Sequence, residues 1–120
     1  MSVNTINTHN KEIIHLDFKN FNPDMLITEL DIARNLIATK KHNSVLIIAD
    51  ITGTSFDPKI LIHLKFFMDH NRKYVKFTAM LGVTGMRETI VNQIIRFTGR
   101  TNIKLFNNYN EAENFLVNLE

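Results

Sequence analysis

The chain has 120 residues, of which 44% are apolar and 22% are charged, and it contains no cysteine. This length fits a single domain over residues 1–120, because one hydrophobic core typically serves about 100–150 residues. The composition excludes a two-domain enzyme, thiol catalysis and thiolate metal sites.

The apolar residues are too dispersed for a membrane span. No run of about eighteen apolar residues occurs, and the first thirteen residues are mostly polar, unlike a secretory signal. We therefore expect a cytoplasmic protein.

The charge is unevenly distributed along the chain although the formal net charge is only +2. Residues 58–105 carry nine basic and two acidic side chains, a surplus that could attract phosphates. These cations stand singly or in pairs without interleaved aromatic residues, which disfavours nucleic acid as a partner.

The first part of the chain predicts a hairpin followed by a helix. Residues 11–18 alternate between apolar and polar side chains, as is typical of a strand with one buried face. A weaker strand precedes them, and residues 8–10 predict the turn between the two. Asn22 is the expected N-cap of a helix that has Pro23 at its first position and runs to about Lys41. Its expected core stripe consists of Leu26, Leu30, Ala33 and Ile37.

The rest of the chain alternates between strands and helices. A nearly unbroken aliphatic run at residues 44–51 predicts a central strand that is covered on both faces. The further elements are helices over 58–70, 85–98 and 110–119 and strands over 75–83 and 103–106. This alternation predicts an α/β fold with a mixed or parallel sheet.

Three short sequence segments, together with this order of elements, resemble those of a known family. They are ADITGTSFD at 49–57, GVTG at 82–85 and FTGR at 97–100. The chain from about Lys11 to Leu119 resembles the SpoIIAA-like branch of the STAS superfamily, which joins sulfate transporters with anti-sigma factor antagonists. The resemblance implies a four- to five-stranded mixed sheet with helices packed mainly on one face. It also implies a regulatory or ligand-binding role in place of a catalysed reaction.

The loop after the central strand is the first candidate site. In the best understood members of the superfamily, a serine that follows an aspartate is phosphorylated here. In this chain the corresponding step is Asp57-Pro58, and proline has no hydroxyl. A phosphate on Ser55 would still lie near a helix N-terminus, whereas the alternative is that the polar side chains cap the loop. The candidate phosphorylation or docking residues are Asp50, Thr52, Thr54, Ser55 and Asp57.

Catalytic and metal-binding patterns are absent from the sequence. It has no phosphate-binding glycine motif, nucleophile elbow or metalloprotease helix, and its histidines form no short ligand pair with a carboxylate. Asp17 and Asp50 are expected on neighbouring strands, where a carboxylate pair could do acid–base chemistry, but Asp50 is better suited to orienting the loop. We predict no catalytic residue, no metal and no cofactor, and therefore no enzyme.

Two of the predicted helices carry more apolar residues than one buried face requires. At about 100° per residue, Ile62 and Phe66 lie opposite the core side of helix 58–70, and Val91 and Ile95 lie away from the core stripe of helix 85–98. The expected core stripe of helix 85–98 consists of Met86, Ile90, Ile94 and Phe97. The two spare pairs could line an apolar groove, meet another subunit or a membrane, or pack against each other.

Two functions are compatible with these features. The leading hypothesis is a non-enzymatic STAS-like regulatory module that docks a protein partner through loop 52–57 and helix 58–70, with a homodimer left open. The alternative is a small carrier or peripheral membrane domain that holds an apolar, lipid-like molecule between helices 58–70 and 85–98. In that case Arg87, Arg96 and Arg100 would contact its anionic end or a membrane surface.

Overall fold

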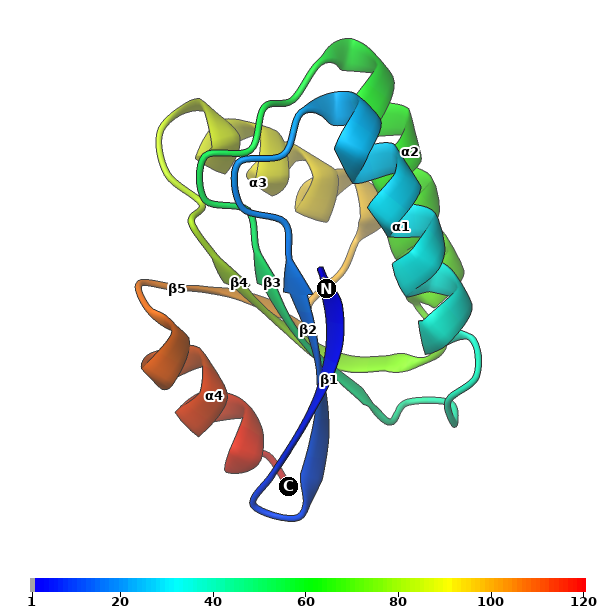
Figure 1. The fold of residues 1–120 in the computed structure, drawn as a ribbon, viewed down its shortest axis with the longest axis vertical. Coiled ribbons are helices and arrows are strands. Elements are labelled where there is room, and N and C mark those ends of the chain that lie inside the picture. Colours follow the sequence, from blue (N-terminus) through cyan, green and yellow to red (C-terminus); the bar gives the residue numbers. More distant parts are fainter. Residues whose placement is uncertain (1) are drawn as a thin grey trace.

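The structure is a computed structural model that describes residues 2–120, and its centre is a five-stranded sheet (Figure 1). The strands lie in the order in which they occur in the chain: β1 (Val3–Thr8), β2 (Lys11–Asp17), β3 (Val45–Asp50), β4 (Val75–Leu81) and β5 (Ile103–Phe106). β1 pairs antiparallel with β2, and every other neighbouring pair is parallel. The expected α/β fold with a mixed sheet is confirmed.

Four helices cover the two faces of this sheet unequally. They are α1 (Pro23–Ile37), α2 (Pro58–Asn71), α3 (Met86–Thr98) and α4 (Tyr109–Val117). Figure 1 shows α1, α2 and α3 over one face and α4, in red, over the other. Three of the four helices thus share a face, which confirms that the helices pack mainly on one side. Among the helices of residues 2–120, none combines the length and the apolar character that a membrane span requires.

Local signals in the sequence determine how the first elements begin and end. His9 and Asn10 both adopt positive φ, at 51° and 61°, which closes the predicted hairpin. The Asn22 side chain accepts a hydrogen bond from the backbone N–H of Met25 at 2.8 Å and caps α1. α1 ends at Ile37, earlier than expected, because no further apolar side chain follows that could be buried on its core side.

The alternating side chains of the central strands separate two hydrophobic cores. Ile14 and Ile47 pack in the core beneath α1 and α2, whereas Ile13 and Ile48 pack in the core beneath α4. β3 is therefore covered on both faces as predicted. β2 is also buried on both faces along part of its length, because α4 covers the face that was expected to be polar.

The predicted core stripe of α3 is wrong at both of its ends. Met86 is 83% exposed and Phe97 is 73% exposed, whereas Val91 is buried and Ile95 lies toward the sheet. α3 has apolar side chains around much of its circumference, so packing against the sheet, and not the helical period, selects its buried side.

Candidate functional site

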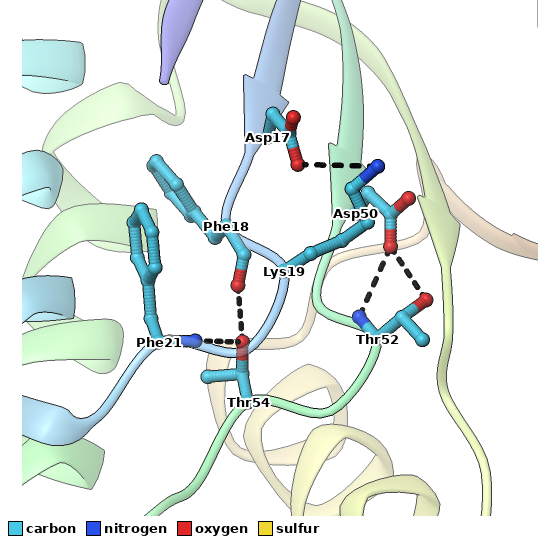
Figure 2. A network of polar contacts seen from close by, with 7 residues as sticks. All are labelled: Asp17, Phe18, Lys19, Phe21, Asp50, Thr52 and Thr54. Atoms are coloured by element: carbon cyan, nitrogen blue, oxygen red, sulfur yellow. Dashed lines mark hydrogen bonds and ion pairs between the residues drawn. The ribbon is translucent and has the colours of Figure 1, made fainter. Parts of the chain in front are cut away.

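Asp17 and Asp50 lie at the ends of β2 and β3, where the loop that follows the central strand begins (Figure 2). They are register partners on neighbouring strands, as the sequence predicts. One Asp50 carboxylate oxygen accepts hydrogen bonds from the backbone N–H of Thr52 at 3.0 Å and from its hydroxyl at 2.6 Å. Asp17 lies 3.8 Å from the ammonium of Lys19. Both carboxylates thus have partners within the chain, and Asp50 orients the loop.

Thr54, in the middle of this loop, forms hydrogen bonds with the segment that follows β2. It is only 2% exposed, and its hydroxyl donates to the carbonyl of Phe18 and accepts from the backbone N–H of Phe21 (Figure 2). The backbone N–H of Ser55 adds a bond of 2.9 Å to the Phe21 carbonyl. Because its hydroxyl is buried, Thr54 cannot contact a partner or accept a phosphate without local unfolding.

The remaining loop candidates divide into a helix cap and one free hydroxyl. Asp57 accepts a hydrogen bond from the backbone N–H of Ile60 at 2.9 Å and is the N-cap of α2. Ser55 is exposed, and no hydrogen bond of its hydroxyl occurs within residues 2–120. Phosphorylation of the loop stays a prediction, and these contacts favour Ser55 as its position.

The contacts of Thr54 give a first testable expectation. Thr54→Val leaves the Phe18 carbonyl and the Phe21 N–H without their buried partner, which should lower the free energy of unfolding by about 1–3 kcal/mol. Ser55→Ala is the matched control and should change it by less than about 0.5 kcal/mol. Urea unfolding followed by circular dichroism measures both variants. Equal stability of the two variants would contradict the structural role of Thr54.

A second candidate site lies on the outer side of α2 and α3. We define the outer surface as Ile62, Phe66 and Phe97, which are 69%, 67% and 73% exposed. The ammonium of Lys65, on α2, lies 4.1 Å from the centre of the Phe97 ring on α3 and so connects the two helices. The prediction that Ile62 and Phe66 lie away from the core is confirmed, and Phe97 was missed because it was assigned to the core stripe.

The three arginines proposed as anion contacts do not form one group. Arg87 bonds to the Gly82 carbonyl at 3.1 Å and to the Thr84 hydroxyl at 3.3 Å. Arg100 is only 7% exposed, so it does not reach a surface ligand, whereas Arg96 is exposed beside Phe97. Burial lowers the pKa of the Arg100 guanidinium below its ordinary value. Of the three arginines, only Arg96 borders the outer surface.

A third candidate site is a cavity of about 90 Å³ between α3 and the sheet. Val91 and Ile95 line it, but Ile62 and Phe66 do not, so the four residues predicted to share one groove belong to two separate sites. The other lining side chains are mostly apolar and come from α1, α2 and the sheet. Asn71 and Arg100 also line the cavity. Asn71 could not be found by sequence reasoning, because an asparagine at the end of a helix usually serves as a cap.

Comparisons with known proteins assign none of these three sites. No protein-family model matches the sequence, and no curated protein is significantly similar to it. The function is therefore inferred from the geometry of the loop, the outer surface and the cavity.

Proposed function

We propose that the chain is a non-enzymatic, STAS-like regulatory module that binds a partner protein through the outer surface of α2 and α3. The exposure of Ile62, Phe66 and Phe97 carries this proposal, since each side chain is about two-thirds exposed or more. Large apolar side chains that gather on neighbouring helices are typical of interaction surfaces. Phenylalanine is also among the residues enriched where proteins meet.

The charges around this surface indicate the chemistry of the partner. Lys59 lies one turn before Ile62, Lys65 lies over Phe97, and Arg96 is the sequence neighbour of Phe97. Within residues 2–120 none of these three cations forms an ion pair. Complementary charge favours a protein segment with apolar anchors flanked by acidic side chains.

A membrane surface is less well matched to the same region. Regions that bind acidic lipids by charge typically gather about four to eight basic residues. Here only three unpaired cations, Lys59, Lys65 and Arg96, accompany the apolar residues. An acidic side chain, Asp69, also lies on α2, where it pairs with Arg72 at 3.7 Å. The balance of charges therefore favours an acidic protein segment over a bilayer.

The loop 52–57 supports this function by positioning α2. Its Asp57 caps the helix that carries Ile62 and Phe66, and its Thr54 anchors the loop to the end of β2. A modification at the exposed Ser55 would thus lie at the start of the docking helix. This arrangement supports a regulatory role in which the loop controls how α2 is presented.

Photo-crosslinking from the outer surface can identify the partner protein. A photo-crosslinking residue at position 66 should trap a specific protein in the source cell, whereas one at Asn114, an exposed position on α4, should not. The purified partner should then bind with 1:1 stoichiometry by calorimetry, and its affinity should fall as salt is raised because the charges are exposed. The crosslinked peptide should contain acidic and apolar residues.

Other occupants give different results. A crosslink at position 66 only to a second copy of the chain, with a dimer in light scattering, would replace the partner protein by self-association. Flotation with vesicles of anionic lipid, without a protein crosslink, would assign the surface to a membrane. Either outcome would overturn the proposal.

A further inference from the structure

Asn71, at the end of α2, has a buried donor without an acceptor. The residue is 2% exposed and lines the cavity, and its side-chain Nδ2 has no hydrogen-bond partner within residues 2–120. Within the same residues, its side chain forms one hydrogen bond, between Oδ1 and Nδ1 of His70 at 3.4 Å. Buried amide donors are nearly always paired, so this one indicates an absent acceptor.

Arg100 brings a buried cation to the same cavity. Its Nε donates to the Asn102 side-chain oxygen at 2.9 Å, and its Nη1 donates to the Met68 carbonyl at 3.1 Å. No carboxylate within residues 2–120 forms an ion pair with it, and Asp69, the acidic group whose charge influences it, is paired with Arg72. Buried cations are normally paired with an anion, so the guanidinium also lacks an expected partner.

These two groups occupy one end of the cavity. Arg100 is bonded to Met68, which precedes Asn71 by three residues, so both groups lie at the last turn of α2. Asn102 holds the guanidinium in place, because its own side chain donates to two backbone carbonyls of β4 at 3.2 Å. The remaining wall, which includes Val91 and Ile95, is mostly apolar. The cavity thus has a polar end and an apolar body.

We propose that this cavity binds a small carboxylic acid with a short apolar tail. The carboxylate accepts hydrogen bonds from Asn71 and Arg100, and the tail packs against Val91 and Ile95. A cavity of about 150 Å³ in another protein holds benzene, which has six non-hydrogen atoms, so about 90 Å³ accommodates about four non-hydrogen atoms, the carboxylate included. Acetate has this size, with a methyl group as its apolar tail. The site is independent of the outer surface, since Ile62 and Phe66 do not line it.

The proposal is tested by nuclear magnetic resonance titration of the folded chain with acetate. We expect saturable shifts of the Asn71 side-chain amide and of the Val91 and Ile95 methyl groups. The neutral analogue ethanol and the longer acid 3-methylbutanoate should each bind at least ten-fold more weakly. Equal affinity for the alcohol would overturn the assignment of a carboxylate, and shifts that avoid the cavity residues would overturn the site.

Variants separate the cavity from a surface site. Val91→Phe fills the apolar body and should abolish the shifts, whereas Gln93→Ala, at an exposed position of α3, should leave them unchanged. Asn71→Leu keeps the side-chain size and removes the donor, so it should weaken binding of the acid more than binding of the alcohol. It also serves as the second variant if Val91→Phe does not fold. Unchanged affinity for the acid in a folded Val91→Phe or Asn71→Leu protein would contradict the proposal.

Discussion

Gly82→Ala should lower the free energy of unfolding by about 3 kcal/mol or more. Gly82 follows β4 with φ at +77°, a conformation that residues with a Cβ adopt only with strain. A Cβ here would also lie 2.5 Å from the backbone nitrogen of Thr52 and 2.6 Å from its Cα. Backbone atoms cannot rotate away, so the loop after β3 must move and the contacts of Asp50 with Thr52 are disturbed.

Gly99→Ala is the matched control for this expectation. Gly99 also has positive φ, at +68°, but nothing lies within 4 Å of the position of an added Cβ. Only the backbone strain applies, so the loss should be about 1–2 kcal/mol. Urea unfolding of both variants measures the difference. A loss at Gly82 no larger than the loss at Gly99 would show that the loop after β3 is not held against the end of β4.

Ile48→Ala should be the most destabilising single truncation in β3, with a loss of about 4 kcal/mol. Its side chain is fully buried in the core beneath α4. Ile47 is also buried, but it lines the cavity on the opposite face and therefore has fewer packing partners. Ile47→Ala should cost less, about 2–3 kcal/mol.

Thermal and urea unfolding of the two β3 variants distinguish these values. The comparison is well matched, because the residues are chemically identical, adjacent and both in the central strand. Equal losses, or a larger loss for Ile47→Ala, would indicate that the space beneath α3 is fully packed in solution. That result would also remove the cavity on which the carboxylic acid site depends.

Much of the fold was predictable because its signals are local. The Asn22 cap, the proline that begins α2 and the positive-φ residues of the β1–β2 turn each act within a few residues. The aliphatic run of β3 likewise predicts burial on both faces, and both cores meet there. Local signals of this kind do not depend on how the elements later pack.

The orientation of α3 could not be predicted in the same way. One apolar stripe consists of Met86, Ile90, Ile94 and Phe97, and a second consists of Val91 and Ile95. The helical period therefore supports burial of either stripe. Packing against the sheet buries Val91 and places Ile94 and Ile95 along the cavity, which leaves Phe97 exposed. Arg100 was expected on the surface, but it follows the left-handed turn at Gly99 and bonds to the end of α2.

The outer surface could be predicted in part, whereas the contacts of the loop after β3 could not. Ile62 and Phe66 are surplus on a helix whose core side is clear from its period, so their exposure was predictable. The roles of the loop residues depend on contacts between distant segments. The bond from Thr54 to Phe18 spans thirty-six residues, and no pattern near Thr54 indicates it.

The affinity of the purified partner for Phe66→Asp tests the proposed docking function most directly. Phe66 is 67% exposed and its side chain supports no core contact, so the variant should unfold at the same temperature as the unsubstituted chain. A buried aromatic anchor typically contributes at least about 2 kcal/mol to binding, so the dissociation constant should rise by about 30-fold or more. Unchanged affinity in a folded Phe66→Asp protein would contradict the proposed docking function, as would loss of folding.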